Sequence, residues 1–565
     1  MDKKVGVLGG GQLGRMLVEA ANRLNIQVNV LDKELAPAKQ ISAHDGHISG
    51  SFKDEQSIRI LAEKCDVITV EIEHVDTKVL AQIQTPVEPS AKTITTIQDK
   101  YLQKQHLIEG GIATAESVAI EHKTVDELTA VGNDLGLPFM LKARKDAYDG
   151  RGNFPVRSAS DFQKALEFLG DRQLYAEKWA DFRLELAVNV VQTKDGPLAF
   201  PTVETIHEDS ICKLVYAPAR NVSAKISQEA QELAKRAVAT FTGKGVYGVE
   251  MFLLKDDTLL INEIAPRPHN SGHYTIEACP LSQYDAHLRA ILDLPIPESS
   301  LQIREPAIML NILGGSQPDS HFEVAKTALS NPCTSIHLYG KGAGTKGRKM
   351  GHMTVTASTM AEAEILIQPL IDIVDKVKGK AIDEEASLKK QNKPLVAVIM
   401  GSDSDMNVLQ AGVAVLEKLK IPYTSRITSA HRTPEHMATF VSSAASNGLE
   451  VIIAAAGGAA HLPGMAAAYT ALPVIGVPVR SRTALDGMDS LLSEVQMPAG
   501  VPVATIGINN STNAALLAAR ILGIKHGWIQ RAVEDYAANS KSQVLGKDAT
   551  LADVGFQAYF DRFMK

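Results

Sequence analysis

The sequence predicts an α/β protein built from several domains, with a parallel sheet near each end of the chain. Short apolar strands alternate with amphipathic helices in the first 75 residues and again after residue 394, which is typical of parallel α/β folds. Near residue 250, two apolar strands joined by a short polar turn predict a β-hairpin. The length of 565 residues requires several cores, because one domain usually has about 100–200 residues.

The first elements follow directly from the apolar pattern. A strand is expected at Val5–Leu8, a helix at Leu13–Leu24 and a second strand at Val28–Leu31. Another strand is expected within Val67–Val75. From about Thr95 the sequence pattern changes and predicts longer polar helices and strands. The first part is therefore predicted to be a small parallel α/β domain.

Two later segments predict further boundaries. The proline-rich stretch Pro295–Pro306 precedes a small β-rich piece that extends to about Lys378. The segment Lys378–Pro394 is charged and almost free of large apolar residues, so we expect a linker. Strand–helix units then repeat to the C-terminal region, as in one compact parallel domain.

Composition and cysteine usage indicate a soluble cytosolic protein. The chain is 45% hydrophobic, carries a net charge of −7 and has no run of Lys and Arg, so an extended nucleic-acid surface is not expected. It contains no signal-peptide pattern and no apolar stretch of membrane-spanning length. Its cysteines lie far apart and form no metal motif, which favours reduced thiols in the core: Cys65, Cys212, Cys279 and Cys333.

The glycine-rich turn near the N-terminus allows two interpretations. Gly9–Gly14 matches the pattern GxGxxG, and Asp32 follows 18 residues after Gly14. This is the fingerprint of dinucleotide-binding Rossmann folds, although a tight turn that only packs a helix on a strand has the same pattern. A dinucleotide-dependent dehydrogenase is therefore one alternative. In either case, backbone N–H groups at a helix N-terminus favour an anion.

Charged residues in the middle of the chain favour a nucleoside triphosphate instead. Lys142 ends an apolar strand and is followed by the glycine-containing loop Ala147–Asn153, which can cover phosphates. Glu177–Ala180 is a short polar hinge between two strands. Glu250 and Glu263 lie on the two strands of the predicted hairpin, and carboxylates without His or Cys partners suit Mg²⁺. Any one of these glutamates alone would more often face solvent, but the ordered set argues for a site.

These residues resemble the ATP-grasp superfamily, over about residues 1–378. The motifs GGGQLGRM, EIEHV, AYDGRGN, NEIAPRPHNSGH and KGRKMGHM are similar to those of the synthetases that make 5-(carboxyamino)imidazole ribonucleotide. The resemblance implies a Rossmann-like subdomain at 1–94, an ATP-grasp domain at 95–300 and a small β-rich subdomain at 301–378. It also implies that ATP activates bicarbonate as carboxyphosphate, which carboxylates the exocyclic amine of aminoimidazole ribonucleotide.

The same resemblance implies a set of binding residues. Glu250 and Glu263 would hold Mg²⁺, and Arg267 would act at the reaction centre, where a guanidinium can also bind phosphate. The implied ATP contacts are Lys100, Lys142, Ala147, Tyr148, Asp149, Gly150, Arg151, Gly152, Asn153, Glu177, Lys178, Trp179, Ala180, Glu185, His207, Asn262 and Glu263. The implied substrate contacts are Gln12, Tyr148, Asp149, Arg151, Arg267, His269, Asn270, Lys341 and Arg348.

Three motifs mark the last part of the chain. In GSDSD (401–405), Ser402 and Ser404 suit either helix capping or a bound phosphate. His431 in SAHRTP and His461 in AAAGGAAHLPGM both follow predicted strands, at the edge where parallel sheets bind ligands. Although most histidines are structural, this position favours catalysis for His431, and less strongly for His461.

Together the three motifs resemble the purine carboxylase/mutase family over about residues 394–525. The resemblance implies a flavodoxin-like domain at 394–565 after a linker at 379–393, and a homo-oligomer with the size of an octamer. SAHRTP with AHLPG is similar to the branch that moves a carboxyl group from the exocyclic nitrogen to the ring carbon. It implies substrate contacts at Ser402, Asp405 and Arg432, with His431 and His461 as catalytic residues.

The order of the two parts is similar to that of fungal-type two-enzyme fusions of purine biosynthesis. Two alternatives remain besides the dehydrogenase. The back half could carboxylate the free amine directly with carbon dioxide, or the chain could be a non-enzymatic nucleotide sensor. The tail from about Lys525 lies beyond the resemblance.

Overall fold

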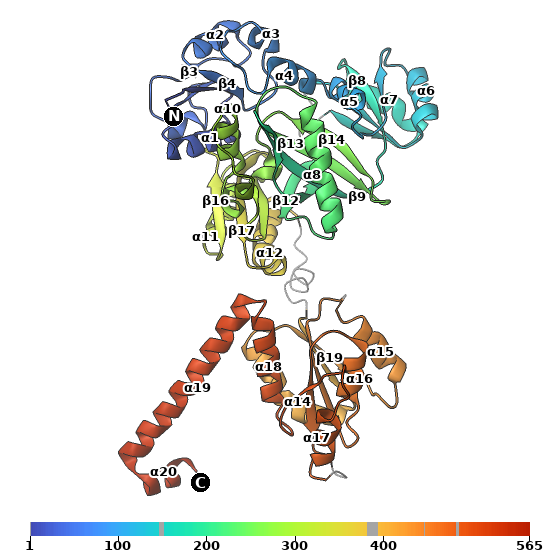
Figure 1. Ribbon diagram of the computed structural model, residues 1–565, viewed down its shortest axis with the longest axis vertical. Coiled ribbons are helices and arrows are strands. Elements are labelled where there is room, and N and C mark those ends of the chain that lie inside the picture. The colour runs from blue at the N-terminus through green and yellow to red at the C-terminus, as the bar shows by residue number, and fades with distance from the viewer. Residues whose placement is uncertain (1, 146–151, 381–393, 446, 482–484, 565) are drawn as a thin grey trace. The chain divides into compact units, whose positions relative to one another are not determined.

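The computed structural model describes residues 2–145, 152–380, 394–445, 447–481 and 485–564 (Figure 1). The chain divides into two compact units, Met1–Ile382 and Asp383–Lys565. Both units are α/β, which confirms the predicted fold class. Among the described helices, none combines the length and the apolar character needed to cross a membrane.

The first unit begins with the predicted parallel sheet. Its four strands have the order β3-β2-β1-β4, and all of their pairings are parallel. The predicted strand at Val67–Val75 is shorter than expected, because after Val70 the chain turns and directs Glu71 inward. The elements are β1 (Val5–Leu8), α1 (Gln12–Arg23), β2 (Val28–Asp32), β3 (Ile48–Ser49), α2 (Glu55–Glu63), β4 (Val67–Val70), α3 (Thr77–Leu80), α4 (Ala91–Gln98) and α5 (Lys100–Glu109).

A second, antiparallel sheet of four strands follows, with the order β5-β8-β6-β7. Helices α6 and α7 cover it, and their apolar residues share one core with β6 and β8. The chain leaves this sheet at Lys178 and enters the next one at Phe182, so residues 179–181 connect the two. The elements are β5 (Ser117–Ile120), α6 (Val125–Leu135), β6 (Phe139–Ala143), β7 (Asn153–Val156), α7 (Phe162–Leu169) and β8 (Leu174–Lys178).

The third sheet of the first unit has nine strands and contains the predicted hairpin. β13 (Gly245–Leu254) pairs antiparallel with β14 (Leu259–Ala265), and α8 packs on this end of the sheet. A bulge lies in β14, because Glu250 pairs with Glu263 while Met251 pairs with Ile261. Its other elements up to residue 301 are β9 (Phe182–Thr193), β10 (Gly196–Ala199), β11 (Val203–Glu208), β12 (Ile211–Ala217), α8 (Ala224–Ala239), α9 (Thr275–Ala278) and α10 (Gln283–Ile291).

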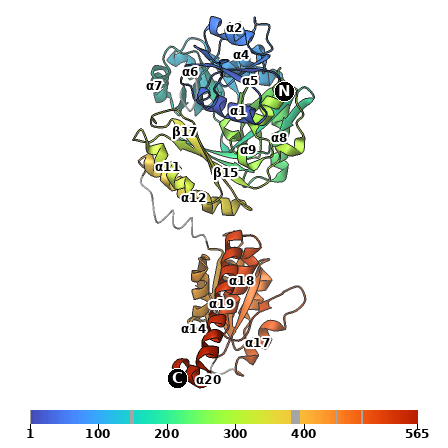
Figure 2. The same ribbon diagram turned by 90° about the vertical axis from the view of Figure 1, so that its left-hand side faces the viewer.

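The last part of the first unit continues this sheet. β15 (Ala307–Leu313) pairs with β12, and β17 and β16 extend the sheet beyond it. Helices α11 and α12 lie together against these strands (Figure 2). The predicted small subdomain therefore shares its sheet with the region before it. The remaining bounds are α11 (Ser320–Leu329), β16 (Thr334–Leu338), β17 (Lys349–Thr356) and α12 (Met360–Val377).

The second unit has one sheet of five parallel strands, in the order β19-β18-β20-β21-β22. This is the flavodoxin-like order, as predicted. Helices α14 and α18 approach closely, since a Cβ on Gly412 would lie 2.5 Å from the backbone oxygen of Ser511. The elements are β18 (Val396–Met400), α14 (Met406–Lys418), β19 (Tyr423–Ile427), α15 (Pro434–Ser442), β20 (Val451–Gly457), α16 (Leu462–Tyr469), β21 (Val474–Val479), α17 (Met488–Val495), β22 (Ala504–Thr505), α18 (Ser511–Gly523), α19 (Gly527–Val554) and α20 (Phe556–Phe563).

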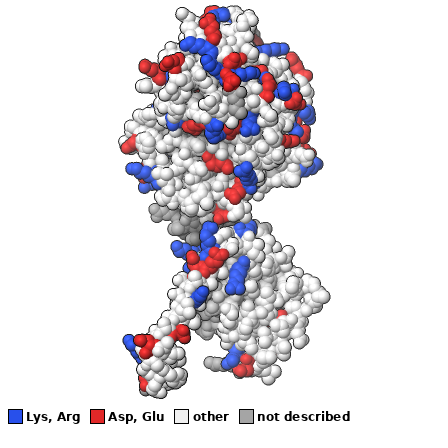
Figure 3. All heavy atoms as spheres, turned by 60° about the vertical axis from the view of Figure 1, so that its left-hand side comes forward, with Lys and Arg blue, Asp and Glu red and all other residues white. Residues whose placement is uncertain are grey.

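The surface carries charges of both signs, and the four cysteines differ in exposure. On the face shown in Figure 3, Lys and Arg side chains are interspersed with Asp and Glu. All four cysteines are free thiols. Cys212 and Cys279 are buried as expected, whereas Cys65 is half-buried and Cys333 is exposed. The prediction of core thiols is therefore wrong for Cys333, which lies at a turn with a φ of +57°.

A buried carboxyl group in the second unit predicts an unusual dependence of stability on pH. Glu494 of α17 is 0% exposed, and neither of its carboxyl oxygens has a hydrogen-bond partner among the described residues. A Cβ on Gly476 of β21 would lie 2.4 Å from one of these oxygens, so the carboxyl group packs directly on the sheet. Burial raises the pKa of Glu494 from its ordinary value near 4.5 to about 9.

The folded state therefore holds a proton on Glu494 that the unfolded state releases above about pH 4.5. Stability then falls as pH rises from about 5 to 8, by at most about 1.4 kcal/mol per pH unit. We expect Glu494→Met to remove this slope and to raise the melting temperature of the second unit most at the alkaline end. Thermal unfolding across this range measures the effect, with the exposed Glu435→Gln as a control. Parallel pH profiles for wild type and Glu494→Met would contradict it.

Candidate active sites

The glycine-rich turn before α1 is closed by a carboxylate of the chain itself. The backbone N–H groups of Gly11 and Leu13 both donate to Glu71, the second over 3.1 Å. Gly10 donates its N–H to Asp32 over 2.8 Å. A Cβ on Gly11 would lie 2.5 Å from Glu71, which explains why glycine is needed there. These donors are not free for a pyrophosphate, so the dinucleotide alternative does not fit.

Two lysines and a buried glutamate lie where the second and third sheets of the first unit are joined. Lys142 of β6 and Lys104 of α5 each lie 2.8 Å from a different oxygen of Glu177. Glu177 is only 3% exposed, and the two ammonium groups outweigh its burial and lower its pKa. Its side chain is thus committed to holding Lys142. The hinge predicted at 177–180 comprises the last two residues of β8 and the start of the connection between the sheets. Its backbone and the exposed side chains of Lys178 and Trp179 remain available for contact with a nucleotide.

A pair of carboxylates lies on the hairpin, as predicted. Glu250 and Glu263 are direct partners on β13 and β14, and the bulge at Asn262 places two residues opposite Glu250. Glu263 lies 3.0 Å from the ammonium group of Lys100. Burial and the negative charge of Glu263 raise the pKa of Glu250 to about 7. Because two facing carboxylates repel each other, a divalent cation coordinated by their oxygens would relieve the repulsion.

Three further predicted residues line the same hairpin. His207 of β11 contacts the carboxylate of Glu185 on β9, which raises the pKa of His207 despite its burial. His269 lies 3.8 Å from Glu250 and is hydrogen-bonded to Ser271 over 2.9 Å. Burial lowers the pKa of His269 to about 3, so its imidazole is neutral. The structure therefore brings the predicted ribose, nucleotide and metal residues into one cluster.

The predicted substrate residues of the first unit have partners of different kinds. Arg267 donates two hydrogen bonds to Glu73, over 2.6 and 3.2 Å. Lys341 donates to the side chain of Gln12 over 2.6 Å, which joins the first and last parts of the unit. Asn270 forms a reciprocal amide pair with Asn311, which fixes the orientation of its side chain. Arg348 is exposed.

The predicted phosphate-covering loop is only partly described. Gly152 accepts a hydrogen bond from the N–H of Ala143 over 2.7 Å, and Asn153 begins β7 beside Lys142. The other members of the loop lie outside the described residues: Ala147, Tyr148, Asp149, Gly150 and Arg151.

The three motifs of the second unit meet at the carboxyl edge of its sheet. His431 and His461 are hydrogen-bonded between Nε2 and Nδ1 over 2.8 Å. Arg432 donates to the carbonyl oxygen of Gly401 over 2.9 Å, which links SAHRTP to GSDSD. Both histidines and Arg432 are exposed, so in one chain the described residues do not close a pocket around them.

GSDSD serves as a helix cap in this structure. The side chain of Ser402 accepts from the N–H of Ser404 over 3.4 Å, and Asp405 accepts from the N–H of Ser402 over 3.2 Å. These contacts form a capping box, so the serines have the helix-capping role that was one of the two predicted possibilities. Burial raises the pKa of Asp405. The cap does not exclude ligand binding, because it holds Ser402 beside Arg432 at the edge of the sheet.

Three residues of the first site were not predicted from the sequence. Glu71 and Glu73 lie in EIEHV, a motif noted above without roles for its residues, and Glu73 is paired with Arg267. Lys104 gave no signal in the sequence, since a lysine on a polar helix normally faces solvent. In the structure Lys104 is 2% exposed and paired with Glu177.

Comparisons with known families agree with this division. Residues 1–98 match the ribonucleotide synthetase preATP-grasp domain, and residues 105–284 match the ATP-grasp domain. Residues 307–365 match the phosphoribosylaminoimidazole carboxylase C-terminal domain, and residues 395–543 match AIR carboxylase, in which AIR is aminoimidazole ribonucleotide.

Individual relatives cover the whole chain or its first unit. The phosphoribosylaminoimidazole carboxylases of Candida albicans and Saccharomyces cerevisiae are each 52% identical to it, over 100% and 99% of this chain and 100% of their own lengths. A crystal structure of carboxyaminoimidazole ribonucleotide synthase from Aspergillus clavatus complexed with ATP is 65% identical, with a TM-score of 0.65. The match covers 66% of this chain and 99% of the chain of that synthase.

The fold and the two sites define an ATP-grasp synthetase joined to an AIR carboxylase/mutase domain. The chain belongs to the phosphoribosylaminoimidazole carboxylase family, as a fungal-type bifunctional member. It is an enzyme of purine biosynthesis that carboxylates aminoimidazole ribonucleotide.

Proposed function

We propose that the first unit makes the carbamate of aminoimidazole ribonucleotide with ATP, and that the second unit moves its carboxyl group to the ring. The observation that carries the first step is the facing pair Glu250 and Glu263, with Lys100 and Lys142 close by. A second structure from Aspergillus clavatus, 64% identical to this chain, is in complex with ADP and 5-aminoimidazole ribonucleotide. That complex supports the same ligands here.

In this proposal Glu250 and Glu263 hold Mg²⁺, and Lys100 and Lys142 contact the phosphates of ATP. Their donor sets fit, since the carboxylates offer hard oxygen ligands and each lysine is held in place by a glutamate. When bound, Mg²⁺ offsets charge on the transferred phosphoryl group. Glu177–Ala180 supports the adenine, Glu185 and His207 lie at the ribose, and Asn262 lies beside the metal.

The chemistry of the first unit needs no covalent nucleophile from the protein. Bicarbonate oxygen attacks the γ-phosphorus of ATP, which gives carboxyphosphate and ADP. The exocyclic amine then attacks the carboxyl carbon and phosphate leaves. Arg267, positioned by Glu73, and neutral His269 would orient the reacting groups at this centre. The other proposed substrate contacts are Gln12, Tyr148, Asp149, Arg151, Asn270, Lys341 and Arg348.

In the second unit, His431 carries the proton. Protonation of the carbamate nitrogen releases carbon dioxide, the ring carbon attacks it, and His431 removes the proton from that carbon. His461 lies within hydrogen-bond distance of His431 and orients its ring. Ser402, Asp405 and Arg432 would hold the ribonucleotide at the edge of the sheet.

The exposure of the second site supports a proposed homo-oligomer, with the octamer of the family as its expected size. Carbon dioxide must be kept near the ring, but His431 and His461 are exposed in one chain. A second copy would cover them. We also propose that the enzyme works in the cytosol, where its four free thiols stay reduced.

Separate fragments test this division of labour. A fragment that ends at Ile382 should release ADP only when aminoimidazole ribonucleotide and bicarbonate are present. A fragment that starts near Gln391 should fold, oligomerise and isomerise supplied carbamate without ATP, because the boundary lies between the two compact units. The proposal fails if the second fragment is inactive by itself and regains activity only when the first fragment is added.

A further inference from the structure

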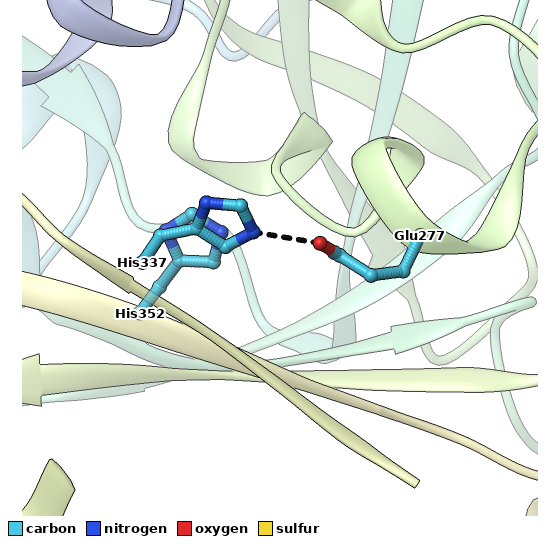
Figure 4. A group of neighbouring side chains, drawn as sticks. All are labelled: Glu277, His337 and His352. Atoms are coloured by element: carbon cyan, nitrogen blue, oxygen red, sulfur yellow. Dashed lines mark hydrogen bonds and ion pairs between the residues drawn. The ribbon is translucent and has the colours of Figure 1, made fainter. Parts of the chain in front are cut away.

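Two histidines and a glutamate of the first unit, none of them assigned to the site above, converge on one side of the large sheet, where His352 pairs in register with Asn311, the amide partner of Asn270. His337 of β16 and His352 of β17 are direct partners in the antiparallel register, and Glu277 lies on α9. The two imidazoles stack with centroids 4.5 Å apart and planes 10° apart (Figure 4). Glu277 faces their edges and lies 2.6 Å from Nε2 of His337. One ligand atom from each residue lies within 4.8 Å of the others.

This cluster contains buried polar atoms that the rest of the described chain does not satisfy. His352 is 0% exposed, and its Nε2 has no hydrogen-bond partner among the described residues. The second carboxyl oxygen of Glu277 also has none. Native proteins leave few buried polar atoms unpaired, because each one loses its hydrogen bonds to water. Two such atoms beside the same imidazole of His337 indicate a missing ligand.

The hydrogen bonds around His352 leave its Nε2 available to bind a metal ion. Its Nδ1 lies 2.9 Å from the hydroxyl oxygen of Tyr339, which is itself buried. If Nδ1 donates its proton to that oxygen, the lone pair of Nε2 is free to bind a metal. Metal-ligating histidines almost always donate their other N–H to an oxygen in this way.

The donor set distinguishes this cluster from the magnesium pair. Two imidazole nitrogens and one carboxylate oxygen are ligands of Zn²⁺ and similar transition ions, whereas Mg²⁺ prefers oxygen alone. A tetrahedral ion with bonds of about 2.0–2.2 Å holds its ligand atoms about 3.3–3.6 Å apart. Because planes 10° apart direct the two nitrogen lone pairs side by side, the rings must rotate out of their stack for both nitrogens to bind one ion. An ion can enter, since the side chains of His337 and Glu277 are 22% and 14% exposed.

We propose that Glu277, His337 and His352 bind one divalent transition-metal ion of the zinc type. The ion ties α9 to the β16–β17 hairpin, and α9 follows the segment that carries Arg267 and His269. The site is separate from the pair Glu250 and Glu263 and would be present without nucleotide.

Titration of the metal-free, full-length protein with Co²⁺ tests the proposal. The protein carries His431→Asn, which removes the exposed histidine pair of the second unit, and excess Mg²⁺ occupies the carboxylate pair of the first. We expect one Co²⁺ per chain, a visible absorption band of a nitrogen-and-oxygen site, and displacement by Zn²⁺. Zn²⁺ should also raise the melting temperature of the first unit.

Variants assign the signal to the cluster. Glu277→Gln keeps the size and a hydrogen bond to His337, and should weaken Co²⁺ binding at least about 100-fold, since loss of even an outer partner costs 10–100-fold. His337→Asn is a second variant with the same expectation. The exposed histidine His122 serves as a control, and His122→Asn should bind as before. Absence of a one-to-one Co²⁺ complex, or equal affinity in Glu277→Gln and its parent, would overturn the proposal.

Discussion

Replacing Glu263 by alanine should abolish the ADP release that depends on aminoimidazole ribonucleotide, while the second unit still isomerises supplied carbamate. Glu263 faces Glu250 across the hairpin and pairs with Lys100, so its loss removes a proposed metal ligand and frees that lysine. Removal of one such charge-stabilising group from phosphoryl-transfer sites costs about 10³-fold or more. Coupled measurement of ADP and of ring-carboxylated product separates the two activities.

An isosteric variant and a control on the same hairpin sharpen this test. Glu263→Gln keeps the shape of the side chain, so the same loss would reflect charge rather than misfolding. Asp256→Asn changes a carboxylate at the exposed turn of the hairpin and should leave ADP release unchanged. Near-normal ATP turnover in Glu263→Gln would refute the metal assignment.

Replacing His431 by asparagine should uncouple the two units. Asparagine keeps some hydrogen bonding to His461 but cannot carry the proton, and loss of a positioned acid–base group typically costs about 10²–10⁴-fold. The isomerisation should slow by that factor while ADP release continues. The carbamate should then accumulate and revert, so that ATP is consumed without ring-carboxylated product.

The neighbouring residues provide the comparison for this variant. His436→Asn alters an exposed histidine of the following helix α15 and should behave as wild type. His461→Asn should show a smaller loss than His431→Asn, because His461 acts through its hydrogen bond to His431. Product formation near the wild-type rate in His431→Asn would show a structural role, and His461 would become the candidate proton carrier.

Features encoded by short stretches of sequence could be predicted, whereas long-range partnerships could not. The hairpin with Glu250 and Glu263 and the edge with His431 and His461 follow from local patterns. Glu71 closes a turn 60 residues before it, and Arg267 pairs with a glutamate 194 residues away. Such pairs depend on how the strands assemble into sheets, and one sequence does not reveal this.

Side-chain roles were also harder to predict than positions. Glu177 lies at the predicted hinge, but its carboxylate holds Lys104 and Lys142 in the core. Ser402 lies at the predicted edge and caps a helix there. The boundary predicted at residue 300 lies within a continuous sheet, since β15 pairs with β12. The proline-rich segment correctly indicates a loop, but a loop does not show where the hydrogen bonding of a sheet ends.

The most direct test of the two-step account follows labelled bicarbonate into the ring carboxyl group, with and without ATP, at low bicarbonate concentration. If the carbon passes through an ATP-made carbamate, ring-carboxylated product forms only with ATP, and one ADP appears for each product molecule. Equal rates of labelling with and without ATP would show that the second unit carboxylates the free amine directly, and would contradict the account.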